Sequence, residues 1–260
     1  MRVLLFGGDG FLGTAIKKAL SGSGHTIAGV PRIDITDYAN FKELPTDVDV
    51  VINCAAKIPS TAPIQYADME RVNAGGAKNV AQWVSTNNIG RLIHCSTASI
   101  LVRPDNKYAI SKRKGEEEVL KILPDATIVR FSALYGEGMK WFGVIPTFID
   151  SALAGEKLQV SSGARADFLH VHDAARSIVC AVEKRTPGIV HVASGVETSI
   201  VELASIVLSA APKAQASIEI IDSPLSSAII DTTRMKKELD FEPSISIQDG
   251  IQRIIQSKVV

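Results

Sequence analysis

Arg2-Val3-Leu4-Leu5-Phe6-Gly7-Gly8-Asp9-Gly10-Phe11-Leu12-Gly13 is the stretch that decides the fold of this chain. Its first five residues form an apolar run typical of a buried parallel strand, and a helix-like segment follows at residues 14–20. Gly7 permits a tight turn, Gly10 lets the backbone approach a pyrophosphate, and Gly13 lets the helix pack closely on the sheet. In this context the turn predicts a dinucleotide-binding site, although a flexible loop remains the alternative.

Apolar runs alternate with amphipathic segments through the first half of the chain. The runs cover residues 25–30, 47–53, 91–96 and 127–131, with helices expected at 68–85 and 111–122. This alternation predicts the α/β class, a Rossmann-type doubly wound parallel sheet whose ligands bind beyond the carboxyl ends of its strands. After Tyr135 glycines and short elements become frequent. We therefore expect a dinucleotide-binding domain over residues 1–135 and, over most of 136–260, a smaller C-terminal substrate-binding lobe, with later segments free to return to the first domain.

Composition narrows the function classes. The chain has 260 residues, is 46% hydrophobic and carries zero formal net charge. Without a basic excess, neither a nucleic-acid partner nor an anionic membrane surface is expected. No apolar stretch is long enough to span a bilayer, and the chain starts on a strand rather than a signal peptide, which predicts a cytoplasmic protein. Cys54, Cys95 and Cys180 are scattered in apolar surroundings, which predicts buried thiols and no metal site.

Tyr108 and Lys112 lie one helical turn apart, so both side chains share a helix face. A lysine ammonium beside a phenol favours phenolate, which predicts a lowered tyrosine pKa and proton transfer at a carbonyl or alcohol oxygen. Alone, the pair is also typical of a solvated helix face. The glycine turn and the hydroxyl-rich strand end Ser96-Thr97-Ala98-Ser99 together favour the catalytic interpretation.

In order and spacing, these motifs resemble the extended short-chain dehydrogenase/reductases, of the NAD-dependent epimerase/dehydratase family. The resemblance runs nearly end to end. The motifs that carry it are residues 7–13, 34–37, 53–57, 72–76, 96–99, Tyr108 with Lys112, 129–136, 167–173, 231–234 and 239–243. Gly76 stands where the family usually has threonine.

The resemblance implies a role for each matching residue. Tyr108 would be the general acid/base, Lys112 would hold the nicotinamide ribose, and Thr97 would hydrogen-bond the substrate oxygen. Substrate-binding candidates are Ser96, Ser99, Trp141 and Arg165; the two serines are equally typical of hydroxyls that close a strand end, and Trp141 of a core anchor. Cofactor-binding candidates are Gly7, Gly10, Phe11, Leu12, Gly13, Arg32, Asp34, Ile35, Ala55, Ala56, Lys57, Asn73, Tyr108, Lys112 and Phe131.

The end of the second strand bears on the choice of cofactor. NAD enzymes usually place an acid there on the ribose hydroxyls, whereas this chain has Gly29-Val30-Pro31-Arg32. Arg32 would suit a ribose phosphate, or it is simply a surface arginine. We therefore expect NADP(H), with NAD as the alternative.

NADP(H) favours a reductase of a keto group, and the resemblance favours a nucleotide-linked (deoxy)sugar as its substrate. The first alternative is a nucleotide-sugar epimerase or dehydratase with tightly bound NAD. The second is a non-enzymatic cofactor-binding sensor or scaffold of the same fold.

The substrate side departs from the family pattern. The arginine that usually precedes the 167–173 motif is Ala166 here, and Arg165 lies one residue earlier. The link at residues 100–107 is also short, which predicts an open substrate side and keeps a small carbonyl substrate possible. The resemblance further implies a homodimer, for which the candidate faces, equally able to face the sheet, are Val80, Ala81 and Val84 together with Val119, Leu120 and Leu123.

Overall fold

The computed structural model describes residues 1–259 except 60–63, 140–142, 212–215 and 225–228. A parallel sheet of six strands forms its larger part, in the order β2-β1-β3-β4-β5-β9. The direction of the strand order reverses between β1 and β3, which is where ligands bind in sheets of this kind. The predicted Rossmann-type fold is confirmed. The strands are β1 (Arg2–Phe6), β2 (Thr26–Gly29), β3 (Val50–Asn53), β4 (Leu92–Thr97), β5 (Thr127–Phe131) and β9 (Gly188–Val192).

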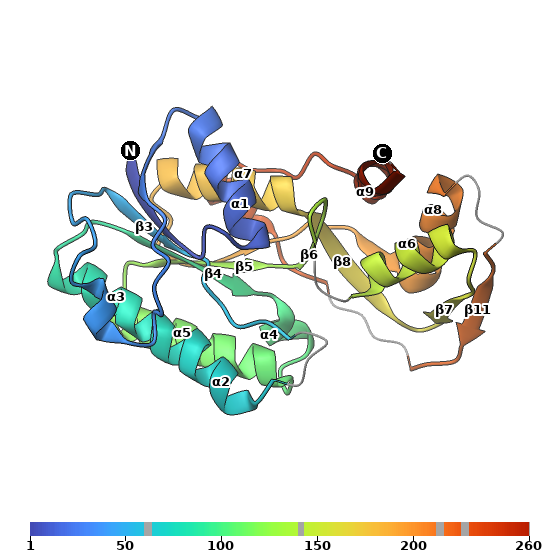
Figure 1. Cartoon of the computed structure of the whole chain (residues 1–260), viewed down its shortest axis with the longest axis horizontal. Coiled ribbons are helices and arrows are strands. Elements are labelled where there is room, and N and C mark those ends of the chain that lie inside the picture. Colours follow the sequence, from blue (N-terminus) through green and yellow to red (C-terminus); the bar gives the residue numbers. More distant parts are fainter. Residues whose placement is uncertain (60–63, 140–142, 212–215, 225–228, 260) are drawn as a thin grey trace.

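Helices cover both faces of this sheet (Figure 1). On one face lie α1 (Phe11–Gly22) and α7 (Val171–Glu183), and on the other α3 (Ala77–Thr86) and α5 (Lys107–Ile122). The strands read as continuous apolar runs because both of their faces are buried. Each face has its own core, around Leu5 and Ile52 under α1 and α7 and around Leu4 and Val51 under α3 and α5.

Two short helical elements lead into α3 and are tightly packed. They are α2 (Tyr66–Glu70) and a π-helical turn, η2 (Arg71–Gly76). A Cβ on Gly76 would lie 2.5 Å from Cδ1 of Ile35, so the threonine usual in the family would collide with this buried isoleucine. A Cβ on Gly115 of α5 would lie 2.2 Å from the carbonyl oxygen of Asn73. These two glycines let η2 approach its neighbours closely.

The second half of the chain contributes to two bodies. β9, α7 and η3 (Met235–Leu239) join the large sheet and its core, whereas the elements named below form a smaller lobe beside it (Figure 1). The lobe has a core around Phe148, Leu203 and Ile251. Its elements are β6 (Ala133–Tyr135), α6 (Val144–Ala154), β7 (Leu158–Ser161), β8 (Arg165–His170), β10 (Glu197–Ser199), α8 (Ile200–Ala210), β11 (Ile218–Ile221) and α9 (Ile247–Val259). The short elements α4 (Ser99–Val102), η1 (Tyr38–Phe41) and η3 (Met235–Leu239) complete the chain.

Buried polar contacts fix the smaller lobe against the sheet. The fully buried carboxylate of Asp173 in α7 accepts hydrogen bonds from the backbone N–H groups of Ser244 (2.9 Å) and Ile245 (2.8 Å). The hydroxyl of Tyr135 donates to the carbonyl of Ser246 at 3.2 Å. Ser244, Ile245 and Ser246 directly precede α9, so these three hydrogen bonds set the position of that helix.

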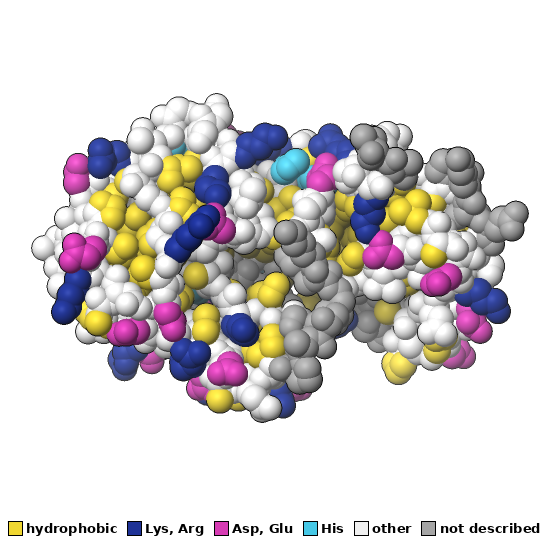
Figure 2. All heavy atoms as spheres, in the orientation of Figure 1, with side chains coloured by type: hydrophobic (Ala, Val, Ile, Leu, Met, Phe, Trp, Pro, Cys, Tyr) yellow, Lys and Arg dark blue, Asp and Glu magenta, His cyan; other side chains and the backbone are white. Residues whose placement is uncertain are grey.

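Three observations bear on possible partners. Val80, Ala81, Val84 and Val119 are buried in the core beneath α3 and α5, so these predicted dimer faces pack on the sheet instead. Acidic and basic side chains are intermingled on the face shown in Figure 2. Within the described residues, none of the helices is both long enough and apolar enough to cross a bilayer.

Candidate active site

Three cavities lie along the carboxyl edge of the large sheet and the adjoining lobe. The central cavity, about 480 Å³, is lined by residues 10–13, Thr97, Tyr108 and Lys112 among others. The outer cavity, about 380 Å³, lies by β1 and β2 and reaches Arg32 and Asp34. The distal cavity, about 430 Å³, lies toward the smaller lobe and includes Arg103 and Arg165. The central cavity shares lining residues with both of the others, so the three lie next to one another along this edge, and we refer to them together as the cleft.

The glycine turn is shaped for a dinucleotide. Gly7 has φ +74°, a conformation that side chains rarely adopt. A Cβ on Gly13 would lie 2.2 Å from the carbonyl oxygen of Gly7, so only glycine lets α1 start this close to the turn. Gly10 caps α1 without a side-chain hydrogen bond, and no acid occupies the first turn. Residues 10–13 at this helix end line the central cavity, and a helix N-terminus without an acid suits a pyrophosphate.

The predicted cofactor residues divide into two groups. All of them except Lys57 and Asn73 line the central or the outer cavity, within the part of the chain that is described. Asn73 is buried, and its amide holds both the N–H of Lys57 (2.8 Å) and its carbonyl (2.9 Å) and donates to the hydroxyl of Ser111 (2.9 Å). Asn73 is thus placed to position the loop after β3 against α5.

Thr97, Tyr108 and Lys112 meet at the central cavity from two elements. Thr97 ends β4, and its hydroxyl donates to Oγ of Ser99 at 3.1 Å. Asn106 caps α5 by accepting from the N–H of Tyr108 at 2.8 Å, which starts the helix at the point that carries the pair. Nζ of the buried Lys112 donates to the carbonyl of Cys95 at 2.8 Å.

The pKa of Tyr108 differs from the sequence prediction. Burial raises it to about 12, rather than Lys112 lowering it. Burial also lowers the pKa of Lys112, because removal from water disfavours its charged form. With this pKa Tyr108 is a protonated phenol near neutral pH, which is the form that can donate a proton.

Arg32 lies at the outer cavity as an exposed side chain. Its Nε donates to Oδ2 of Asp9 at 2.6 Å, and Lys17 donates to the other oxygen of that carboxylate at 3.0 Å. Asp34, at the same cavity, accepts from the N–H and hydroxyl of Thr36. These contacts keep the pKa values of both carboxyl groups below their usual range, so two carboxylates and one arginine border the cavity.

Two buried hydroxyls at the strand ends have no hydrogen-bond partner among the described residues. They belong to Ser96 on β4 and Ser132 directly after β5, and both residues line the central cavity. Sequence reasoning missed Ser132. Its position one residue after Phe131 was the available signal, because the carboxyl ends of neighbouring parallel strands meet at one edge.

The distal cavity contains Arg165, and with it Arg103, which sequence reasoning also missed. Nε of Arg165 donates to Oε2 of Glu197 at 2.9 Å. Arg103 is exposed in the short link between α4 and α5 and makes no side-chain hydrogen bond or ion pair among the described residues. Trp141, the remaining substrate-binding candidate, lies outside the described residues.

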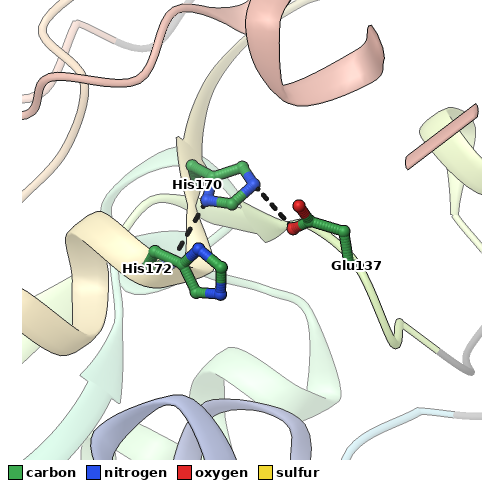
Figure 3. A group of neighbouring side chains, drawn as sticks. All are labelled: Glu137, His170 and His172. Carbon is green, nitrogen blue, oxygen red and sulfur yellow. Dashed lines mark hydrogen bonds and ion pairs between the residues drawn. The ribbon is translucent and has the colours of Figure 1, made fainter. Parts of the chain in front are cut away.

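Three side chains that could hold a metal ion meet where β8 passes into α7 (Figure 3). Nδ1 of the buried His170 accepts from the backbone N–H of His172 at 3.3 Å, so the neutral ring carries its proton on Nε2. That nitrogen lies 3.1 Å from Oε2 of Glu137. The arrangement suits a pair that fixes the start of α7, where His170 is the capping residue. We assign no metal to it.

The glycine turn, the Thr97, Tyr108 and Lys112 constellation and the fold together define an NAD(P)-dependent enzyme of the extended short-chain dehydrogenase/reductase type. A family model described as "RmlD substrate binding domain" matches residues 1–229. The chain belongs to this family, within the epimerase/dehydratase group of extended short-chain dehydrogenases.

Individual relatives carry several reaction names. A dTDP-4-keto-6-deoxy-D-glucose reductase from Streptomyces niveus is 30% identical over 78% of this chain and 76% of its own length. A UDP-N-acetyl-alpha-D-glucosaminuronate decarboxylase from Bacillus cytotoxicus is 25% identical over 98% of this chain and 97% of its own.

Solved structures agree on the fold. RMD from Pseudomonas aeruginosa, complexed with NADPH, has a TM-score of 0.87 at 20% identity, covering 98% of this chain and 97% of its own. WbmG from Bordetella bronchiseptica, in complex with NAD and UDP, has a TM-score of 0.85 at 23% identity, covering 100% and 96%.

Proposed function

We propose that this protein reduces a keto group on a nucleotide-linked sugar, with NADPH as the hydride donor. The observation that carries the proposal is the Thr97, Tyr108 and Lys112 constellation at a central cavity that adjoins a second, arginine-bearing cavity. The central cavity suits the nicotinamide and the reacting sugar. The distal cavity suits the remainder of a substrate too long for one pocket.

The relatives support this substrate class. The reductase from Streptomyces niveus acts, by its name, on a dTDP-linked keto sugar and matches most of both chains. A dehydratase from the same organism and the Bacillus decarboxylase, also named for nucleotide-linked sugars, match nearly the whole chain at lower identity. Nucleotide-sugar epimerase or dehydratase chemistry with retained NAD is therefore the second candidate.

The chain's own residues would divide the chemistry as follows. When bound, the nicotinamide supplies the hydride. Thr97 hydrogen-bonds the substrate oxygen, and Tyr108 gives that oxygen a proton as it gains negative charge. The raised pKa of Tyr108 suits this direction, because it keeps the phenol protonated near neutral pH until it acts. Lys112 holds the ribose hydroxyls beside Tyr108.

Arg32 supports the choice of NADPH. It borders the outer cavity, and its guanidinium needs only to exchange the carboxylate of Asp9 for a ribose phosphate. Both are oxyanions that a guanidinium binds through charge-assisted hydrogen bonds. Asp9 argues against NADPH, because its negative charge would repel a phosphate unless Arg32 and Lys17 neutralise that charge.

Arg103 and Arg165 support an anionic tail on the substrate. Arg165 is already paired with Glu197, whereas Arg103 makes no described contact through its guanidinium. We propose that Arg103 takes over the diphosphate contact that Ala166 cannot make. Arg103→Ala should then raise KM for the nucleotide-linked substrate about tenfold with kcat little changed. The matched control, Arg113→Ala in the exposed part of α5, should leave KM unchanged.

The deciding experiment combines the purified protein with NADPH and dTDP-4-keto-6-deoxy-D-glucose. Loss of one NADPH for each reduced sugar supports the reductase. Conversion of a nucleotide sugar without added cofactor would instead identify the epimerase or dehydratase. Tight NADPH binding without turnover of any nucleotide-linked or small carbonyl compound would leave the sensor or scaffold role.

Three broader expectations stay proposals. We propose that residues 136–260 supply mainly the substrate side, that the protein acts in the cytoplasm, and that it forms a homodimer. Light scattering of the purified protein tests the last of these, and a monomer at micromolar concentration would contradict it.

A further inference from the structure

A buried polar chain ends at the proposed catalytic lysine. It leads from Asn53 at the end of β3 through His94 in β4 to Lys112 in α5, and the mechanism above uses neither Asn53 nor His94. Their side chains are at most 1% exposed. Nδ2 of Asn53 lies 3.2 Å from Nδ1 of His94, and Nε2 of His94 lies 3.4 Å from Nζ of Lys112.

The backbone fixes the direction of the first link. Oδ1 of Asn53 accepts from the N–H of Ala55 at 3.1 Å, so the amide cannot be reversed without setting two donors against each other. Nδ2 of Asn53 is therefore the donor to His94, and Nδ1 of His94 carries no proton. Burial lowers the pKa of His94 well below its usual value, so the ring is neutral and its single proton is on Nε2.

This tautomer directs an N–H bond at Nζ of Lys112. A lysine ammonium has three donors and no acceptor, so it cannot accept from His94. A neutral amine has a lone pair and can accept. The contact thus favours the amine over the ammonium, while the carbonyl of Cys95 accepts one Nζ proton in either form.

We propose that His94 is a positioning residue that favours release of a proton from Lys112, with its tautomer set by Asn53. After Tyr108 gives its proton to the substrate oxygen, the tyrosinate takes one from the Lys112 ammonium. The resulting amine accepts the hydrogen bond from Nε2 of His94, and Lys112 regains a proton from water after the reaction. The inference rests on the proposed roles of Tyr108 and Lys112, but not on the substrate.

Other groups that face Lys112 act on the same equilibrium. They come from the same helix, from β4 and from the segment after β3, and are Tyr108, Glu116, Cys95 and Cys54. Glu116 favours the ammonium, but Arg130 binds its carboxylate through three contacts of 2.5–3.1 Å. Burial lowers the pKa of Lys112 in any case, so the test must separate His94 from burial.

The first test measures the tautomer in the unaltered protein. Nitrogen-15 NMR of histidine-labelled protein distinguishes a protonated from an unprotonated ring nitrogen. We expect Nε2 of His94 to be protonated and Nδ1 to be bare. A proton on Nδ1 would overturn the proposal whether or not any variant folds.

The second test measures Lys112 directly. Protein labelled with carbon-13 at lysine Cε is titrated by NMR with and without NADPH, and Lys112→Arg assigns the signal. His94→Phe keeps the site buried but removes the N–H, and should increase the proton affinity of Lys112 about tenfold, the scale of one hydrogen bond. Asn53→Asp should increase it further, because a carboxylate draws the ring proton to Nδ1.

The matched control is His191→Phe, the same substitution in β9, two strands away in the sheet. This control should leave the pH midpoint of the Lys112 titration unchanged. An unchanged titration in folded His94→Phe would show that burial alone acts on Lys112 and would contradict the proposal. Neither readout needs a substrate, so a failed reductase assay and a failed tautomer assignment are separate results.

Discussion

The cofactor side and the substrate side of the cleft differ in how their polar groups are satisfied. On the cofactor side, polar side chains already have partners, since Asn73 binds the backbone of Lys57 and Arg32 binds the carboxylate of Asp9. On the substrate side, the buried hydroxyls of Ser96 and Ser132 lack partners among the described residues. Buried polar groups are nearly always paired, and those left open are usually completed by water or a ligand. We therefore propose that the cofactor side is preformed and that the substrate supplies the missing partners of the two hydroxyls.

Replacing Tyr108 separates the two sides most sharply. Tyr108→Phe removes the proton donor and should lower kcat by about 10²–10⁴-fold, the usual contribution of general acid catalysis. NADPH affinity should be nearly unchanged, because the glycine turn and Lys112 remain. Steady-state turnover and a fluorescence titration of NADPH measure the two effects. Turnover close to that of the unaltered protein would remove Tyr108 from its proposed role.

The glycine turn tests how rigid the cofactor side is. Gly13→Ala would place a Cβ 2.2 Å from the carbonyl oxygen of Gly7 and 2.5 Å from Cα of Gly8. Neither backbone atom can move without displacing α1, so we expect a loss of about 1–3 kcal/mol in the free energy of unfolding and weaker NADPH binding. Urea unfolding and cofactor titration measure both.

Gly22→Ala is the matched control in the same helix. A Cβ there meets nothing within 4 Å, so the change should stabilise the protein slightly, by up to about 1 kcal/mol, through helix propensity. Equal losses in the two variants would mean that α1 tolerates no change at all, and the argument from Gly13 would fail.

The sequence predicted most of the cofactor side because each element there is local. A strand, a glycine turn and a helix follow one another within the first 22 residues, and the close contacts of Gly10 and Gly13 lie inside that stretch, whereas Gly7 approaches the backbone of Ala55. Tyr108 and Lys112 could also be predicted as a pair, because helix periodicity alone places them on one face. The pKa of Tyr108 could not be predicted from the sequence, because its burial depends on the packing of β4 and α5.

The substrate side was harder to predict because distant segments build it. Arg103, Ser132 and Arg165 meet at one cavity from a link, a strand end and the smaller lobe. Nothing in the residues next to Arg103 reveals that the shortened link carries it to β8. For Asn73 the sequence motif was recognised, but the role of the side chain was not. Only the structure shows that its amide binds the backbone of Lys57 and the hydroxyl of Ser111.

Arg32 tests whether the preformed contacts on the cofactor side are exchangeable. Arg32→Ala should weaken NADPH binding by about ten- to a hundredfold, the range for a hydrogen bond to a charged group, and leave NADH binding within about twofold. Parallel titrations of the two cofactors measure the difference. Arg185→Ala is the control, since Arg185 is an exposed arginine that pairs with Asp125 at 2.8 Å. Equal weakening of both cofactors would make Arg32 a general contact and remove the support for NADPH.

A pair of serine substitutions gives the smallest effects and compares the two sides directly. The hydroxyl of Ser111 accepts from Asn73 at 2.9 Å and donates to the carbonyl of Tyr108 at 2.8 Å, whereas that of Ser132 has no described partner. Ser111→Ala should therefore cost about 1 kcal/mol of unfolding free energy, the usual net value of a hydrogen bond. Ser132→Ala should leave stability within about 0.5 kcal/mol, because no bond is lost.

Ser132→Ala should affect catalysis although it leaves the free energy of unfolding nearly unchanged. If the substrate completes the open hydroxyl, Ser132→Ala should lower kcat/KM by about three- to tenfold, while its urea midpoint stays in place. A drop in stability without a change in kcat/KM would mean that this hydroxyl is satisfied inside the protein, by a bound water for example. The substrate side would then be as preformed as the cofactor side, because its open groups would serve the fold rather than the ligand.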